Sequence, residues 1–144
     1  MISDHKIWFV IVMLMFAFQA QAGSPEDDLM NRFRVAHDNR DADALVDLVY
    51  PEGLDDSIRT QLRQGFQFDF GMKFKLISMK IGDWPDGMPS ERNINGVIYH
   101  LNLKPVGRLE VRFVDQGETG LQNSYPIGEH KGKLYIVTGV PIQE

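Results

Sequence analysis

The sequence predicts an α+β fold, in which three N-terminal helices pack on a curved, mostly antiparallel sheet of about five strands. Apolar residues recur at helical spacing as far as Phe66, and from Met72 onward they follow the alternation of strands. Residues 124–139 contain two short apolar runs on either side of a polar stretch with a glycine, which indicates a β-hairpin. Helices followed by strands are typical of an α+β domain whose helices cover one sheet face.

The composition is that of one globular domain. The chain has 144 residues, of which 43% are hydrophobic and 24% charged. Its net charge is −5 and it has no run of lysine or arginine, so neither nucleic acid nor an anionic membrane surface is expected as a main partner. Because the sequence has no cysteine, disulfides, cysteine-ligated zinc, a thiol nucleophile and a lipidated cysteine are excluded.

Residues 1–22 have the pattern of a secretory signal peptide. Lys6 precedes an unbroken apolar run over residues 7–18, and Ala20 and Ala22 fit the small-residue rule for cleavage after Ala22. An uncleaved membrane anchor is the alternative, but this run is shorter than the roughly 20 residues that a spanning helix needs. The sequence therefore predicts a single mature domain over residues 23–144, periplasmic or secreted and free of the membrane after cleavage.

Three helices are expected before the first strand. Ser24 can cap the first helix, and the acidic residues that follow Pro25 suit the positive end of its dipole. A second helix is expected over residues 42–50, and a third from Asp55 to about Gly71.

The strands are expected to follow one another along the rest of the chain. The first begins at Met72 and has a β-bulge between Leu76 and Ile77, where the alternation changes phase. The next strand is expected over residues 94–103 and another over residues 109–113.

The C-terminal hairpin is the segment around which the domain is expected to be organised. Gly132 can adopt the positive φ that its loop needs at low steric cost. The second strand of the hairpin is apolar at every position over residues 134–137, so both faces of this strand are expected to contact protein. The sequence therefore predicts that this strand lies at the centre of the fold.

The order of these elements, with the motifs NxDxDxLxxL at residues 39–48 and ExKGKLYIV at residues 129–137, resembles the NTF2-like superfamily. That superfamily includes ketosteroid isomerase-like and SnoaL-like domains, and exported members without an assigned role. The resemblance covers about residues 25–140 and implies a cone, in which a curved sheet wraps over helices and leaves a pocket at its open end. Its members include isomerases, dehydratases and binding modules, so the fold alone does not decide the function.

The histidines and serines show no pattern of a metal site or a nucleophile. His37, His100 and His130 are far apart and have no metal-ligand spacing, so no metal and no cofactor are expected. No serine stands in a nucleophile elbow, and no glycine-rich phosphate loop follows a strand.

General acid–base chemistry has three candidate residues. His37 lies on the apolar face of the first helix, Tyr99 lies on an apolar strand face, and Asp69 lies near the end of the third helix. In the implied cone they could point inward, where burial shifts a pKa. Alternatively, His37 is a hydrogen-bonded residue at a helix end, Tyr99 belongs to the core with its hydroxyl at the rim, and Asp69 is solvated.

A turn-rich loop over residues 82–93 carries Trp84 and Met88. These two side chains form either a flap at the rim of the pocket or an anchor that holds the loop to the domain. Trp84 is therefore a candidate ligand-binding residue.

The expected function is non-catalytic binding of a small apolar ligand or a protein partner. The alternative is an enzyme of isomerase or dehydratase type that uses His37, Tyr99 and Asp69 as base and donors. Convergence of these side chains within hydrogen-bond reach in a closed cavity would favour the enzyme.

The final hairpin also predicts a homodimer that forms through the sheet, as the resemblance implies. Only one face of residues 134–137 can cover the helices, and a contiguous exposed apolar patch is uncommon on a soluble monomer. Ile98 and Val114 could widen that patch, whereas Glu110 and Arg112 would interrupt it. A monomer whose outer face is shielded by long side chains is the alternative.

We expect the exported protein to begin at Gly23, because the apolar run and the Ala20-x-Ala22 site direct cleavage there. Intact-mass analysis of exported material measures this directly. Retention of Met1 together with membrane association would contradict it.

Overall fold

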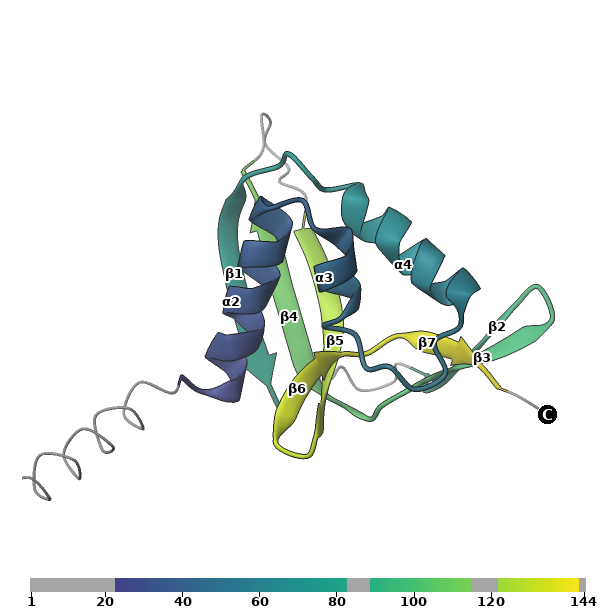
Figure 1. The fold of residues 1–144 in the computed structure, drawn as a ribbon. Coiled ribbons are helices and arrows are strands. Elements are labelled where there is room, and N and C mark those ends of the chain that lie inside the picture. Colours follow the sequence, from purple (N-terminus) through teal and green to yellow (C-terminus); the bar gives the residue numbers. More distant parts are fainter. Residues whose placement is uncertain (1–22, 83–88, 115–121, 143–144) are drawn as a thin grey trace, which may run out of the picture.

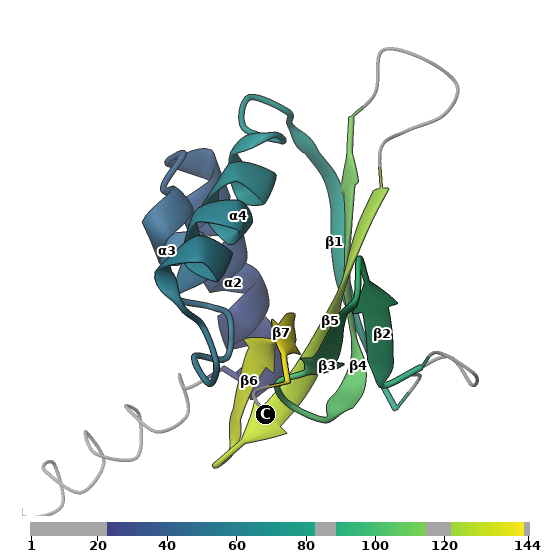
Figure 2. The ribbon, with the colours of Figure 1, turned by 90° about the vertical axis from the view of Figure 1, so that its right-hand side faces the viewer.

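The computed structural model, which describes residues 23–82, 89–114 and 122–142, has three helices and two antiparallel sheets (Figures 1 and 2). The helices are α2 (Pro25–Asp38), α3 (Ala42–Val46) and α4 (Asp56–Gln67). The strands are β1 (Phe74–Ile81), β2 (Glu91–Ile94), β3 (Val97–Leu101), β4 (Pro105–Phe113), β5 (Gln122–His130), β6 (Lys133–Ile136) and β7 (Gly139–Pro141). One sheet has the order β1-β4-β5-β6 and the other β2-β3-β7.

The α+β class is confirmed, and the single sheet of about five strands is replaced by a four-stranded and a three-stranded sheet. All three helices lie on one side of the curled four-stranded sheet (Figure 2). Within the described ranges, no helix is both long and apolar enough to cross a membrane.

The first helix forms as its capping residues predict, whereas the second ends earlier than residue 50. The Ser24 hydroxyl accepts a hydrogen bond from the Asp27 N–H at the start of α2. Helix α3 stops at Val46 because the next residues pair with β6 instead. Ile136 N donates to Leu48 O at 2.9 Å, and Tyr50 N donates to Ile136 O at 2.9 Å. These bonds take backbone groups that a longer helix would use internally.

The single strand expected over residues 94–103 is wrong, because a hairpin turn divides it into β2 and β3. Asn95 and Gly96 both have positive φ, 53° and 85°, which is the backbone of a two-residue hairpin turn. The Asn93 side-chain oxygen accepts from Gly96 N at 2.9 Å and holds the turn.

The bulge in β1 lies one position earlier than expected. Its register against β4 shifts between Phe74 and Leu76, instead of between Leu76 and Ile77. The shift places Phe74 on the same face as Ile77, so both pack against the core, and it leaves Leu76 47% exposed.

The C-terminal hairpin is confirmed, but β6 lies at an edge of its sheet, so the central position expected for it is wrong. Lys131 and Gly132 form the turn with φ of 50° and 77°. Both faces of the following segment nevertheless contact the chain itself. Leu134 and Ile136 enter the core, and the Tyr135 ring packs on Tyr50 with centroids 5.4 Å apart.

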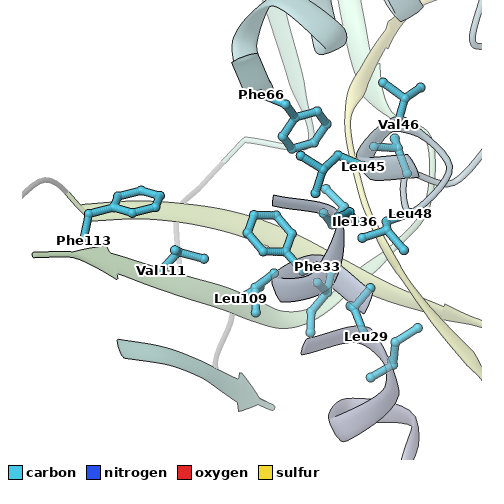
Figure 3. Close-up of a cluster of buried hydrophobic side chains, with 14 residues drawn as sticks. Leu29, Phe33, Leu45, Val46, Leu48, Phe66, Leu109, Val111, Phe113 and Ile136 are labelled. Atoms are coloured by element: carbon cyan, nitrogen blue, oxygen red, sulfur yellow. The ribbon is translucent and has the colours of Figure 1, made fainter. Parts of the chain in front are cut away.

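The core lies between the helices and the four-stranded sheet (Figure 3). Phe33 of α2 contacts rings from three other elements, with centroid distances of 6.4 Å to Phe66, 6.3 Å to Phe74 and 5.6 Å to Tyr125. The buried residues of this cluster are Leu29, Phe33, Ala36, Leu45, Val46, Leu48, Val49, Phe66, Leu109, Val111, Phe113, Ile127, Leu134 and Ile136.

The face of the sheet away from the helices is charged. The buried Glu110 carboxylate lies 3.1 Å from Arg108 Nε and 3.7 Å from Lys80 Nζ. Of the residues expected to widen an apolar patch, Val114 follows β4 and is 55% exposed, whereas Ile98, 46% exposed, lies on β3 in the other sheet. The homodimer stays a prediction, since a partner would meet paired charges on this face as well as apolar side chains.

We expect Gly107→Ala to destabilise the domain by roughly 1–3 kcal/mol, because a methyl group there must displace backbone. A Cβ at Gly107 would lie 2.2 Å from Lys80 O and 2.9 Å from Ile81 Cα on the adjacent strand. Denaturant unfolding measures the loss.

Gly65→Ala is the matched control, because nothing lies within 4 Å of a Cβ at that position of α4. It should stabilise the domain by about 0.5–1 kcal/mol through helix propensity alone. Equal stability of the two variants would contradict the close approach at Gly107.

Candidate functional site

A cleft of about 900 Å³ lies between α4 and the strands β5 and β7. In Figure 1, α4 slants away from β5. Phe66, near its C-terminal end, is the one residue that α4 buries. The other half of the helix lines the cleft with Ile58 and Leu62. The cleft exists because α4 is anchored to the sheet near one end.

The sequence of α4 explains both its position and its apolar side. The Asp55 carboxylate accepts from Ile58 N at 2.8 Å and caps the helix. Ile58, Leu62 and Phe66 follow at four-residue intervals, which places them on one helix face. Arg63, on another side of the helix, holds it to α3, with Nε 2.9 Å and Nη2 2.8 Å from the same Asp43 oxygen.

Asp69, Asn123 and Tyr125 form a polar cluster at the wall of this cleft. The Asp69 side chain, with its residue only 4% exposed, accepts a short hydrogen bond from the Asn123 amide. The same Asn123 nitrogen lies 3.5 Å from the Tyr125 hydroxyl. Asn123 and Tyr125 are two residues apart on β5, so they face the same side of the sheet. One amide group therefore joins the carboxylate to the phenol.

Burial controls the protonation of this cluster. It raises the pKa of Tyr125 to about 12, and the negative charge of Asp69 adds to this effect. Burial also raises the pKa of Asp69, although the hydrogen bond from Asn123 and the nearby His37 counteract it. At neutral pH Tyr125 is therefore a neutral hydroxyl.

His37 lies behind this cluster, on the core side. Its Nε2–H donates to the backbone oxygen of Asp69 at 3.1 Å, and its ring packs between Phe74 and Phe113 at 4.5 Å and 5.4 Å. Burial lowers the pKa of His37, outweighing the hydrogen bond to Asp69 and the charges of Asp38 and Asp69. This is the hydrogen-bonded helix-end role that the sequence left open as an alternative.

Tyr99 lines the cleft on its opposite side, where β3 pairs with β7. Among the residues that the structure describes, no hydrogen bond joins Tyr99 to His37 or Asp69. The structure thus brings His37 and Asp69 together through a backbone oxygen and leaves Tyr99 apart from both. Trp84 and Met88 lie outside the described residues.

Sequence reasoning missed Asn123 and Tyr125 as site residues. The sequence places Tyr125 in an apolar strand run and gives no sign of a role for Asn123. Their spacing of two along a strand was visible in the sequence, but the partner that makes them a cluster, Asp69, comes from a distant helix end. Within the described ranges, no three histidine or carboxylate side chains gather as metal ligands would.

Comparison with known proteins does not assign this chain to a family: no family model matches it, and no curated protein matches it significantly. Its function is therefore inferred from the cleft and its residues.

We expect the domain to lose stability as the pH falls below 6.5, the ordinary pKa of histidine. Since burial lowers the pKa of His37 in the folded state, the unfolded chain takes up this proton first, and acidification then favours unfolding. His37→Phe, which cannot be protonated, should flatten this dependence. Denaturant unfolding over a pH series measures it.

His130→Gln is the control, because His130 lies beside the turn of the C-terminal hairpin, far from the buried aromatic cluster. It should keep the pH dependence of the wild type. If His37→Phe and the wild type lose stability in parallel, the burial of a neutral His37 is not what makes the fold acid-sensitive.

Proposed function

We propose that this chain is an exported, non-catalytic binding domain of NTF2-like type, whose cleft takes an apolar ligand: a small molecule or an apolar segment of a protein. The observation that carries the proposal is the cleft itself, of about 900 Å³, with apolar walls from Leu62, Phe66 and Val137 and one polar cluster. Ligand sites are commonly concave, mostly apolar and supplied with a few oriented polar groups. The curled sheet with helices on one side is compatible with an NTF2-like cone.

The charge of the cleft restricts the ligand. Asp55 and Asp69 are the formally charged side chains that line it among the described residues. Both are acidic, so a neutral or cationic ligand suits the site better than an anionic one.

The polar cluster supports binding over catalysis because its groups already satisfy one another. Asp69 accepts from Asn123, and His37 donates to the Asp69 backbone instead of reaching the cleft. A hydroxyl with a pKa of about 12, that of Tyr125, is a weak proton donor to a reacting group near neutral pH.

The contact of Asp69 and Tyr125 through Asn123 favours one alternative, an acid–base enzyme. A carboxylate whose pKa is raised could take a proton beside a carbonyl, and the phenol could bind the resulting oxyanion. Solvent-deuterium exchange into an enolisable ketone tests it. Exchange faster than in buffer that Asp69→Asn abolishes would favour the enzyme, and exchange at the buffer rate would reject it.

We expect the wild type to bind a neutral apolar dye such as Nile red, and Gly65→Trp to weaken that binding by about tenfold or more. Gly65 lines the cleft and has open space beside it, so an indole there occupies the ligand volume without clashing with the core. Fluorescence titration measures the affinity.

Gly65→Ala again serves as the matched control, since it replaces the same glycine without filling the cleft. It should bind the dye as the wild type does. Equal affinity of the dye for Gly65→Trp would place its binding elsewhere and contradict the assigned cleft.

A further inference from the structure

Strand β6 pairs with the C-terminal half of its antiparallel neighbour β5 and leaves the sheet before it reaches the first residues of β5. The two strands pair from His130 to Ile127 of β5, and Val137 N adds one more bond to Pro126 O at 2.8 Å. The chain then continues into β7, which pairs with β3 in the other sheet. Among the described residues, the first residues of β5 therefore have a strand on one side only, and their free edge borders the cleft.

The register of β5 fixes which backbone groups face this gap. Pro126 presents its carbonyl to Val137, away from β4, and residues two apart along a strand direct their backbone groups to the same side. Ser124 and Gln122 thus direct their N–H and C=O groups into the gap. Among the described residues, neither makes a backbone hydrogen bond there.

A second strand edge faces the same gap from β7. Thr138 O accepts from Asn102 N, and Ile142 N donates to Ile98 O, so residues 138 and 142 face β3. Successive residues of a strand direct their backbone groups to opposite sides, so Gly139, next to Thr138, directs its N–H and C=O away from β3. It lines the cleft together with Ser124.

The gap opens into a cavity on each side. Ser124, Tyr99 and Gly139 line the cleft and also a second cavity of about 730 Å³. Because side chains alternate along a strand, an extended chain in the gap would send every second side chain into each cavity. On the side of α4 those side chains would meet Leu62 and Phe66.

We propose that this gap binds an extended peptide of a partner protein, which adds a strand to β5 in line with β6. This inference rests on the proposed binding function and names its ligand. The peptide is apolar at alternate positions, where it meets α4, and carries a lysine or arginine in the same alternating set, because the charged residues of the cleft wall are Asp55 and Asp69. The side chains of the other set enter the second cavity, whose charged residues are Glu91, Arg92 and Arg108. Main-chain bonds to Ser124 supply affinity, and the apolar pockets supply specificity.

Selection from a phage-displayed library of random seven-residue peptides, with Gly65→Trp as the counter-selection, tests the proposal. Enriched sequences should have apolar residues at alternate positions, with a lysine or arginine in the same alternating set. Methylation of alternate amide nitrogens in an enriched peptide should weaken its binding by about tenfold, because it removes the donors of an added strand. The Ser124 N–H should become protected from hydrogen exchange when that peptide binds.

Ser124→Pro tests the protein side. It deletes an N–H that points into the gap, and Pro126 already occupies the same edge, so the ladder with β4 is retained. Peptide affinity should fall about fivefold to tenfold, while Nile red still binds. Asn123→Pro, which deletes a bond to β4, is the variant expected to unfold. Since peptide methylation needs no protein variant, it decides the question even if Ser124→Pro fails to fold.

Four outcomes would overturn the proposal. Nile red binding without any peptide enrichment would leave the apolar cleft in place and reject the added strand, whereas loss of both would reject the binding function as well. Peptide affinity that survives alternate methylation would exclude main-chain pairing. A wild-type dimer that Ser124→Pro converts to monomer would assign the gap to a second copy of this chain.

Discussion

The side chain of Asn102 holds together the segments that create the cleft. It is buried, and its amide donates to Tyr50 O at 2.7 Å and to Glu52 O at 3.0 Å. Its side-chain oxygen accepts from Thr138 N, and its own N–H donates to Thr138 O. These bonds fix the point at which the chain passes from β6 to β7. Without that change of sheet, the last strand would continue along β5 and cover its free edge.

The aromatic core and the hydrogen bonds of Asn102 hold opposite sides of the cleft. Phe33 ties α2 to β1 and β5 through ring contacts, and Phe66 joins α4 to the same cluster. On the N-terminal side of Phe66, Arg63 binds α4 to α3 and not to the sheet. The two walls of the cleft are therefore fixed independently, which leaves the space between them open without an exposed core.

Local signals in the sequence predicted the local features of the fold. Capping by Ser24 and the turn at Gly132 depend on neighbouring residues alone, and both are found. The turn at residues 95–96 was also local, since Asn-Gly is a strong hairpin signal, but the apolar residues around it suggested one longer strand. The end of α3 could not be predicted, because it depends on bonds to Ile136, which is distant in sequence.

The candidate site was predictable only in part for the same reason. The sequence indicates Asp69, which does line a cleft, but its partner Asn123 depends on the register of β5 against β4. The predicted burial of His37 is correct, whereas the direction in which its ring points is set by the Asp69 backbone and the surrounding rings. Sequence patterns give the side of an element on which a residue lies, and only the tertiary pairing gives the atom that it meets.

A free strand edge is an aggregation hazard, and the sequence limits it here. Pro126 cannot donate at the point where β6 departs, and Pro141 cannot donate on the opposite edge. Among the described residues, the N–H groups that face the gap belong to Gln122 and Ser124 on β5 and to Gly139 on β7. An edge this short cannot template the growth of a long sheet, but it suffices to orient one extended segment. Pro126 therefore ends the open edge on β5 and Pro141 ends it on β7, beside the acidic and apolar side chains of the cleft that would select a partner.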